Sequence, residues 1–334
     1  MQITPTTQKS LVSVIIPTYN RPSYLKSAIE SAVQQIYQNI EIIVSDNCSI
    51  ESPQAIVESF KDRRIRFRRN TTNLGVALNV TKAVQEVKGK YVATLNDDDI
   101  WNKNFLEKLV PHLDANPGLV LAFCDHYIID ADGTINYPDT KKNTRHWKRD
   151  RLQEGIYQPF WEIALVHKAV FAASSAVIRK DAVEWDRLHE AGVFWDYYLS
   201  YLACCSGLGA YYCPERLTQY RVHDQSETMS SASGNVEAKI RKAKAGIFCY
   251  DRFMKDERLK QFNPYFAQKL AHENTTMAIG LLRAGQIAEA RPYLLCALSQ
   301  QKFNLRTIAA LMWSFTLQAL VHRFLRISKY SDRK

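Results

Sequence analysis

The 334-residue sequence contains no CxxC pair, and its seven cysteines are an odd number that lie mostly in apolar surroundings. This pattern argues against a disulfide framework and against a cysteine-based zinc site. The segment before Ser10 is polar and shows no secretory signal. We therefore expect reduced thiols and a cytoplasmic protein. The chain also lacks low-complexity stretches and sustained repeats.

Two glycine-rich phosphate motifs, GxGxxG and the P-loop, are absent as well. Their absence argues against a dinucleotide site and a kinase-type nucleotide site. The net charge is +10, but no RRM, KH, zinc-finger or helix-turn-helix signature accompanies it, so we expect no nucleic-acid partner. Basic clusters of this kind meet anionic lipid or phosphorylated ligands, or form solvated faces. They lie at residues 63–69, at residues 141–151 and in the tail from 306 to 334.

Apolar residues make up 46% of the chain and charged residues 23%, which is ordinary for a globular protein of one large or two smaller domains. Short apolar runs at 11–17, 40–46, 65–69 and 91–95 predict strands. Helical spacing of apolar residues fills the intervals at 24–36, 53–60 and 76–87. This alternation predicts a mostly parallel sheet with helices on both faces.

The later part of the chain continues the α/β pattern. Residues 119–129 predict a strand and residues 130–133 a hairpin turn, followed by extended segments within 170–178 and 211–222. Helices are expected near 180–190 and 196–205. We expect the α/β domain to cover residues 10–230, with a linker at 230–234 and a helical region at 235–334.

Polar residues follow three of the predicted strands: Pro17-Thr18-Tyr19-Asn20-Arg21, Asp46 and Asp97-Asp98-Asp99. Ligands bind at the carboxyl ends of strands in parallel sheets, so these residues mark the expected site. Three adjacent carboxylates repel one another, and a divalent cation compensates for that repulsion. Hard oxygen ligands suit Mg²⁺ or Mn²⁺. The alternative is a solvated acidic turn that caps the next helix.

At this point the chain resembles the bacterial family 2 inverting glycosyltransferases, which have the GT-A fold. The resemblance covers about residues 10–230 and depends on the order and spacing of several segments. These are VSVIIPTYNR (12–21), IEIIVSDNCS (40–49), NLGVALN (73–79), YVATLNDDDIW (91–101), FWDYYL (194–199) and YRVH (220–223) with Ser226.

The resemblance assigns a nucleotide-sugar pocket. It implies that Thr18, Tyr19 and Arg21 line the base and ribose pocket, with Pro17 shaping the turn. Asp46 is implied to accept a hydrogen bond from a pyrimidine ring nitrogen. The alternative roles are a packed aromatic residue for Tyr19 and a helix N-cap for Asp46.

Further residues of that pocket follow from the same resemblance. Asn73 and Gly75 are implied to lie near the donor, or else are plain turn residues. Arg221 is implied to neutralise phosphate, and a surface arginine is its alternative. Positions Asp125 and Ser174-Ser175 match places near the sugar and acceptor, or serve packing only.

The resemblance also implies a Mn²⁺ or Mg²⁺ cofactor. It gives Asp98 as the direct metal ligand, with Asp97 beside the ribose or the metal-bound waters. Many relatives carry aspartate where this chain has Asn96, so Asp99 stays a candidate ligand. His223 is implied to reach the metal or the diphosphate, and its alternative is a structural histidine.

Asp196 falls where the family keeps its general base. An inverting transfer needs a carboxylate that removes the proton of the acceptor hydroxyl. The surrounding Phe194, Trp195, Tyr197 and Tyr198 create an apolar setting that raises the pKa of a carboxyl group. A helix N-cap is the alternative role, and the two are compatible.

The expected function is transfer of a sugar from a nucleotide-sugar, a UDP-sugar by preference, to a glycan or lipid-linked acceptor in cell-surface polysaccharide synthesis. The first alternative is a sugar nucleotidyltransferase, which needs a glycine-rich phosphate loop that PTYNR does not resemble. The second is a non-catalytic scaffold on a transferase fold, against which Asp98 and Asp196 argue.

The helical region carries a charge-free apolar stretch from Thr307 to Val321. About 15 residues are too few to cross a bilayer, which takes about 20. Basic residues flank the stretch: Arg306, Arg323, Arg326 and Lys329. It predicts a helix that lies on an anionic membrane surface, at the inner face of the cell membrane, or alternatively a core or dimer helix.

Overall fold

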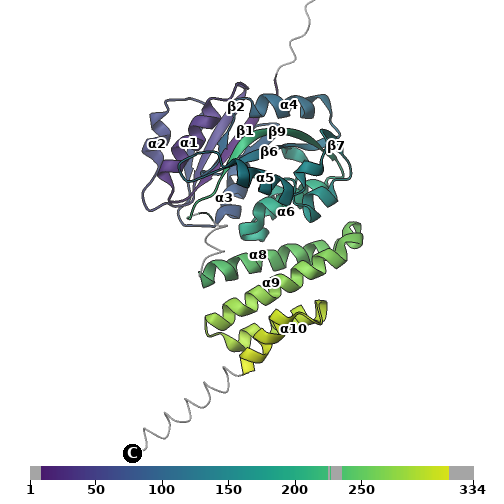
Figure 1. The fold of residues 1–334 in the computed structure, drawn as a ribbon. Coiled ribbons are helices and arrows are strands. Elements are labelled where there is room, and N and C mark those ends of the chain that lie inside the picture. Colours follow the sequence, from purple (N-terminus) through teal and green to yellow (C-terminus); the bar gives the residue numbers. More distant parts are fainter. Residues whose placement is uncertain (1–8, 225, 227–234, 316–334) are drawn as a thin grey trace, which may run out of the picture. The chain divides into compact units, whose positions relative to one another are not determined.

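The computed structural model describes residues 9–224, 226 and 235–315. It divides the chain into two compact units, Met1–His223 and Asp224–Lys334 (Figure 1). The expected linker at 230–234 lies outside the described residues. The first unit is an α/β domain and the second is helical.

The first unit is built on a mixed sheet in which the strands lie in the order β3-β2-β1-β4-β8-β6-β9-β5, with β7 beside β9. The neighbours among β3, β2, β1 and β4 are parallel, as are β6 and β9, whereas β8, β5 and β7 run antiparallel to their partners. The strands are β1 Val12–Thr18, β2 Ile40–Asp46, β3 Ile65–Arg69, β4 Tyr91–Thr94, β5 Ile100–Trp101, β6 Leu119–Ile129, β7 Gly155–Tyr157, β8 Ala176–Arg179 and β9 Gly209–Arg221.

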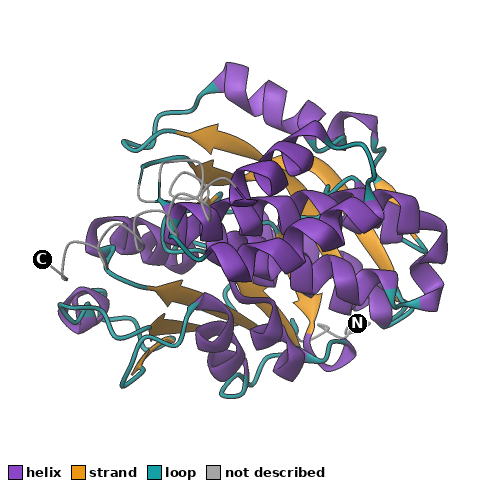
Figure 2. Cartoon of the chain, turned by 90° about the horizontal axis from the view of Figure 1, so that it is seen from below, coloured by secondary structure: helices purple, strands orange, loops and turns teal. Residues whose placement is uncertain are grey.

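Helices of the first unit pack on this sheet, and Figure 2 shows helices in purple and strands in orange. They are α1 Pro22–Val33, α2 Gln54–Ser59, α3 Val76–Val84, α4 Phe105–Ala115, α5 Tyr137–His146 and α6 Trp195–Cys205. Short turns of other helix types are η1 Arg149–Arg151, η2 Glu162–Val166, η3 Lys180–Ala182 and η4 Trp185–Phe194. The predicted α/β class with a mostly parallel sheet is confirmed.

Strand β1 shows why the sheet is covered on both faces. Val12, Val14 and Ile16 belong to one apolar cluster with α1 and α4. Ser13 and Ile15 alternate with them and therefore face the opposite side, where α3 packs on β1. All seven residues of β1 are buried. A strand that is covered on both faces is mostly apolar, and it lacks the alternation of apolar and polar residues that a half-exposed strand shows.

Two expected elements differ from the structure. The helix expected near 180–190 is instead two 3-10 segments, η3 and the start of η4, separated by Val183 in an extended conformation with φ −126° and ψ 137°. The extended segment expected over 170–178 is a strand only from Ala176, since Ser174 has a positive φ of 62° and breaks the run. In both cases a single backbone conformation ends a pattern that the apolar residues alone would continue.

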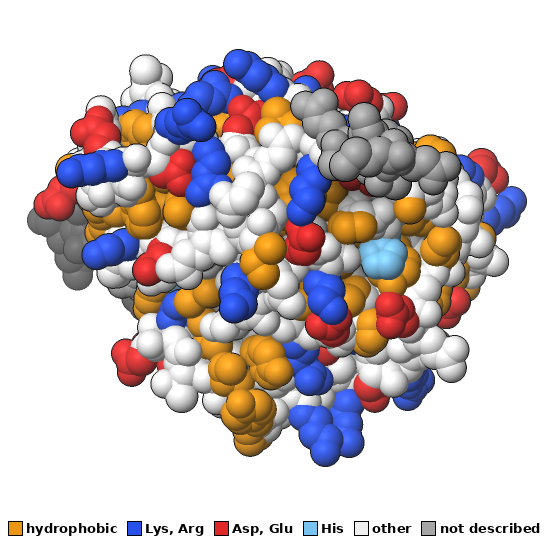
Figure 3. Space-filling view, turned by 90° about the horizontal axis from the view of Figure 1, so that it is seen from above, with side chains coloured by type: hydrophobic (Ala, Val, Ile, Leu, Met, Phe, Trp, Pro, Cys, Tyr) orange, Lys and Arg blue, Asp and Glu red, His pale blue; other side chains and the backbone are white. Residues whose placement is uncertain are grey.

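The arginine cluster at 63–69 forms strand β3 and its approach. Arg64 pairs with Asp62 at 2.6 Å, and Arg68 pairs with Glu86 at 2.9 Å. Arg66 and Arg69 likewise have carboxylate partners. On the face shown in Figure 3, basic and acidic side chains are likewise intermingled. This cluster is therefore a charge-paired strand.

A buried polar network joins β2 to α3. Asn79 is 1% exposed, and its Oδ1 accepts hydrogen bonds from Asn70 at 2.7 Å and from the Ser45 hydroxyl at 2.6 Å. Its Nδ2 donates to the Ser45 carbonyl at 2.8 Å. Arg68 reaches the same Ser45 hydroxyl. One asparagine side chain thus satisfies polar groups from two other segments, the ends of β2 and β3.

The second unit consists of α8 Val236–Met254, η5 Glu257–Phe262, α9 Asn263–Arg283 and α10 Ile287–Gln300, followed by a helical segment at 305–315. The long helices α8 and α9 pack side by side, and α10 packs on α9 (Figure 1). The Thr275 and Thr307 hydroxyls share a buried hydrogen bond of 2.7 Å.

Within the described ranges, no helix is both long enough and apolar enough to cross a bilayer. The predicted interfacial stretch is described as far as Phe315, where Met312, Trp313 and Phe315 are exposed. Its remaining residues, 316–321, and the basic residues at 323, 326 and 329 lie outside the described part.

The polar network yields a stability prediction. Asn79→Ala should lower the free energy of unfolding of the first unit by about 2–4 kcal/mol, because it leaves several buried donors and acceptors without partners. Lys82→Ala, on the exposed side of the same helix, should change it by less than about 0.5 kcal/mol. Urea denaturation followed by tryptophan fluorescence measures both. Equal losses in the two variants would contradict the role of the network.

Candidate functional site

The ends of β1, β2 and β4 bring the predicted polar residues to one edge of the sheet. In the β1–β2 register, Thr18 stands opposite Asp46. The Thr18 hydroxyl donates to Asp97 Oδ2 at 2.8 Å, which joins the loop after β1 to the loop after β4. The backbone N–H of Tyr19 points to the same oxygen at 3.4 Å. The structure therefore unites residues that lie about 80 positions apart in the sequence.

Arg21 lies between two of the carboxylates. One guanidinium nitrogen, Nη1, is 3.1 Å from Asp97 Oδ1 and 2.8 Å from Asp98 Oδ2. Both aspartates are buried, at 4% and 8% exposure. Charges withdrawn from water need compensation, so Arg21 provides the positive charge that keeps these carboxylates in place.

His223 approaches the same carboxylate from β9. Its Nε2 is 3.0 Å from Asp98 Oδ2, and its ring lies 4.7 Å from the ring of Tyr24. Its Nδ1 is buried and has no hydrogen-bond partner among the described residues. Asp98 is therefore the point where α1, the loop after β4 and the end of β9 meet.

Asp99 has a different environment from Asp98. Its Oδ2 accepts hydrogen bonds from the Ser174 hydroxyl at 2.7 Å and from Asn96 at 3.1 Å. Its Oδ1 accepts the backbone N–H of Arg221 at 3.0 Å. Both oxygens of Asp99 thus tie chain segments together, whereas Asp98 contacts the side chains of Arg21 and His223.

The guanidinium of Arg221 does not have the surroundings that we expected from the sequence. It is 4% exposed and donates to the backbone carbonyls of Asp98, Asp130 and Ala131 at 2.8–3.0 Å. Its charge lies over the ring of Tyr24 at 4.9 Å. Arg221 is therefore a structural tie between two loops, which differs from the expected contact with phosphate.

The pKa values of the carboxyl groups reflect this crowding. Burial raises the pKa of Asp97, and the neighbouring charge of Asp98 raises it further, against the opposing effect of Arg21. Burial and Asp98 also raise the pKa of Asp99. Loss of water and repulsion between the carboxylates thus both disfavour the charged forms of Asp97 and Asp99, and added positive charge would favour them.

The side chains present fit a divalent cation that completes its coordination with substrate. Asp98 and His223 offer an oxygen and a nitrogen donor, and the buried Nδ1 of His223 is left without a partner. No group of three or more His, Cys, Asp or Glu side chains is arranged as a metal site in the ranges described. Mg²⁺ commonly takes one or two protein ligands and the rest from phosphates and water.

The other predicted pocket residues lie around this centre. Pro17 is a buried member of β1, and Tyr19 is 42% exposed, so Tyr19 is not a packed core residue. Asp46 is fully buried, accepts hydrogen bonds from Ser49 and lies 3.3 Å from Arg69.

Asn73 and Gly75 form a turn at the start of α3. Asn73 Oδ1 accepts hydrogen bonds from Asn47 Nδ2 at 2.8 Å and from the Gly75 N–H at 2.9 Å. Gly75 has a φ of 79°, and a Cβ placed there would meet no heavy atom within 4 Å. The position therefore borders open space, and its backbone conformation favours glycine.

Asp196 lies in the first turn of α6, apart from the aspartate cluster. Its Oδ1 accepts the N–H of Tyr197 at 2.8 Å. Burial raises its pKa, whereas Lys168 lowers it. In the part of the chain that the structure describes, its side chain shares no hydrogen bond with Asp97, Asp98 or Asp99. The raised pKa suits a proton acceptor at neutral pH.

Sequence reasoning placed Asn20 and Asp125 at the expected site but did not predict their partners. Asn20 has a φ of 56°, and its Oδ1 accepts the N–H of Ile50, which joins the loops after β1 and β2. Asp125 forms a buried ion pair with Arg149, with 2.6 Å between Oδ1 and Nε. The positive φ of Asn20 is the kind of local strain that accumulates at functional sites, and an asparagine after a strand is its only sequence signal.

Comparison with known proteins adds an independent finding. The model of the family "Glycosyl transferase family 2" matches residues 13–183. The putative teichuronic acid biosynthesis glycosyltransferase TuaG of Bacillus subtilis is 32% identical over 152 residues, which are 42% of this chain and 60% of that protein. The alignment thus leaves two fifths of that relative unmatched.

Solved structures show the same fold at low sequence identity. S. aureus TarS 1-349 in complex with UDP-GlcNAc has a TM-score of 0.58 at 16% identity, covering 91% of this chain and 79% of that one. The mannosyltransferase PcManGT from Pyrobaculum calidifontis, in complex with GDP-Man and Mn²⁺, has a TM-score of 0.53 at 16% identity, covering 92% of this chain and 88% of that one. These likenesses establish the GT-A fold of the first unit.

Proposed function

This chain belongs to glycosyl transferase family 2, and from that premise we propose that it transfers a sugar from a nucleotide-sugar to a glycan or lipid-linked acceptor. The observation that carries the proposal is the junction at Asp98, where Arg21 and His223 meet a buried carboxylate at the carboxyl edge of the sheet. We propose a role for it in cell-surface polysaccharide synthesis, which the likeness to a teichuronic acid enzyme supports.

The donor pocket of this proposal consists of the residues around the ends of β1, β2 and β4. Tyr19 is 42% exposed and its backbone N–H lies beside Asp97, which suits stacking of its ring on a base. Asp46 lies at the end of β2, where its carboxylate suits a pyrimidine ring nitrogen. UDP-sugars are the proposed donors, and the complex of TarS with UDP-GlcNAc supports a donor of this class.

We propose Mn²⁺ or Mg²⁺ as cofactor, held by Asp98 with His223. When bound, the cation offsets charge on the departing diphosphate. Arg21 holds Asp97 and Asp98 in position before the donor arrives, and Asp97 orients Thr18 and the Tyr19 backbone. The Mn²⁺ in the PcManGT complex supports this assignment.

Asp196 is the proposed general base of an inverting transfer. Its carboxylate takes the proton of the acceptor hydroxyl as that oxygen forms a bond to the anomeric carbon. The bond between the anomeric carbon and the diphosphate oxygen breaks on the opposite side, and the nucleoside diphosphate leaves. Burial of Asp196 raises its pKa, which strengthens it as a base.

We propose that residues 10–230 carry this chemistry and that residues 235–334 bring the protein to an anionic membrane surface at the inner face of the cell membrane. Exposed Met312, Trp313 and Phe315 on the helix at 305–315 support this assignment. An apolar face beside basic residues is the usual composition of an interfacial helix.

Metal-linked donor binding tests the Asp98 assignment. Asp98→Asn retains an oxygen acceptor for Arg21 but removes the charge, so Mn²⁺-dependent affinity for UDP should fall by at least tenfold. Asp132→Asn removes an exposed carboxylate from a turn of the same unit and should leave the affinity unchanged. Calorimetry with and without Mn²⁺ measures both, and undiminished Mn²⁺-dependent binding by Asp98→Asn would refute the assignment.

Turnover tests the role of Asp196. Asp196→Asn should lower the rate of nucleoside diphosphate release about 10²–10⁴-fold with donor binding retained. Asp196 acts as a base only when it is deprotonated, at a pH above its raised pKa. Wild-type kcat/KM should therefore fall as the pH drops, with a midpoint above the ordinary carboxyl pKa of about 4. Asp181→Asn, an exposed carboxylate, is the control. Near-normal turnover in Asp196→Asn would exclude it as the base.

Membrane association is tested by sedimentation with liposomes. Full-length protein should sediment with anionic liposomes at low salt and less at 1 M salt, where the Debye length is about 3 Å. A chain that ends at Asn304 should remain in the supernatant and keep donor binding. If the full-length protein ignores anionic liposomes, or if truncation abolishes donor binding, the helix serves packing instead.

A further inference from the structure

The helical unit contains a cavity of about 370 Å³ between α8, α9 and the start of the helix at 305–315. Its volume lies within the range of small-molecule sites, about 300–1,000 Å³. Helices α8 and α9 each contribute one face to it, because their lining residues recur at helical spacing, and the helix at 305–315 contributes one residue. The lining residues are Val236, Lys239, Lys242, His272, Glu273, Thr276, Ile279, Gly280, Arg283 and Arg306.

The charges around this cavity are unbalanced. Four cationic side chains face a single carboxylate, Glu273, which is a formal excess of three positive charges with His272 neutral. Lys239 and Lys242 are half-buried, so their charges are partly withdrawn from solvent. Like charges that converge on one hollow destabilise the fold unless an anion joins them.

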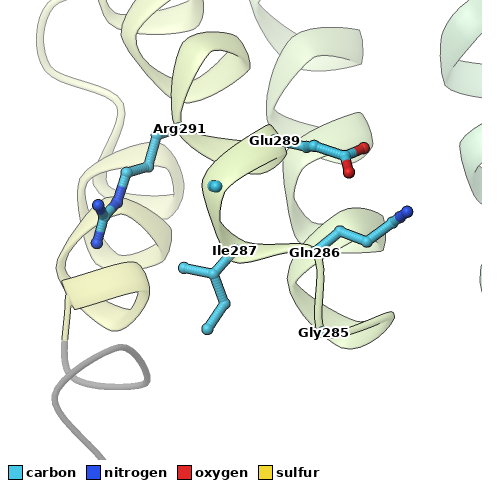
Figure 4. A pocket seen from close by; sticks show the side chains of 6 residues that line it. Gly285, Gln286, Ile287, Glu289 and Arg291 are labelled. Atoms are coloured by element: carbon cyan, nitrogen blue, oxygen red, sulfur yellow. The ribbon is translucent and has the colours of Figure 1, made fainter. Parts of the chain in front are cut away.

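A second cavity in the same unit does not share this excess of positive charge. A cavity of about 410 Å³ lies at the start of α10 and is lined by residues 285–291 except Ala290. It carries one carboxylate, Glu289, and one cation, Arg291, whose side chains point away from each other (Figure 4). Its formal charges cancel, so nothing in it selects an anion.

His272 reports the potential inside the basic cavity. Its pKa is lowered by the loss of surrounding water, and then by the charges of Arg306, Lys269 and Lys242. These groups approach from all three helices, and Glu273 of α9 is the carboxylate beside them. The imidazole thus senses a positive field, in agreement with the count of charges.

We propose that this cavity binds a phosphoryl group. Lysine and arginine side chains that converge from three helices suit the several oxygens of a phosphate or diphosphate. The site is separate from the donor pocket in the first unit, so the proposal stands whether or not the proposed transfer is correct.

Two sources share this chemistry, a phospholipid headgroup and a soluble phosphate compound. Arg306 lines the cavity, and Trp313 follows seven residues later, about two turns along the same face of the helix. Trp313 is 44% exposed. A polar headgroup in the cavity with apolar chains along this face would match that arrangement, so a lipid is the favoured source.

The test compares two pairs of substitutions that remove the same charge. Lys239→Gln with Arg306→Gln alters the cavity, whereas Arg241→Gln with Lys244→Gln alters exposed residues of α8 outside it. Affinity is measured for inorganic pyrophosphate in the absence of metal and for vesicles containing phosphatidic acid. Vesicles of equal charge made with oleate measure general electrostatic attraction. Melting temperatures confirm that all variants are folded.

We expect the cavity pair to lose at least tenfold in affinity and the control pair less than threefold. Bound phosphate should raise the pKa of His272 from its lowered value toward about 6.5, as followed by NMR of the full-length protein. A loss confined to phosphatidic acid vesicles identifies a lipid source, and a loss for pyrophosphate identifies a soluble one. Equal losses in both pairs, or an unchanged pKa of His272, would overturn the proposal.

Discussion

The mutual repulsion of Asp97, Asp98 and Asp99 is the constraint on which the candidate site depends. Three adjacent carboxylates follow a buried strand, and each requires positive charge or hydrogen-bond donors within reach. The chain supplies Arg21 from the loop after β1 and His223 from the end of β9. The loop after β1, the loop after β4 and the end of β9 are therefore fixed relative to one another by the interactions that hold the three carboxylates in place.

Much of this arrangement can be read from the sequence, because strands that are buried on both faces leave unbroken apolar runs. The ends of β1, β2 and β4 and the residues that follow them were all predicted, and the α/β class is confirmed. The sequence does not predict the partners of those residues. Arg221 looks like a phosphate ligand in the sequence, but its guanidinium meets backbone carbonyls, and no side-chain pattern reveals such acceptors.

The same limit applies to segments in which one residue decides the conformation. The extended conformation of Val183 interrupts the helix expected near 180–190, and the apolar spacing around it gives no warning. The sequence does not predict the network centred on Asn79, because an asparagine in a helix resembles any other polar residue until its neighbours in the fold are known. Local patterns therefore predict elements well, whereas long-range polar partners emerge only from the fold.

The two edges of the sheet have a consequence for the behaviour of the protein in a crowded cell. An exposed strand edge is a template on which a second chain can add a strand and begin to aggregate. One edge here is β3, which carries the paired residues Arg66, Arg68 and Arg69, and the opposite edge is formed by β5, two residues long, and β7, three residues long. Charged side chains on the first edge disfavour the addition of a strand, and the strands of the second edge are too short to hold one. A sequence that looks like a binding patch in the chain thus guards an edge of the sheet against strand addition.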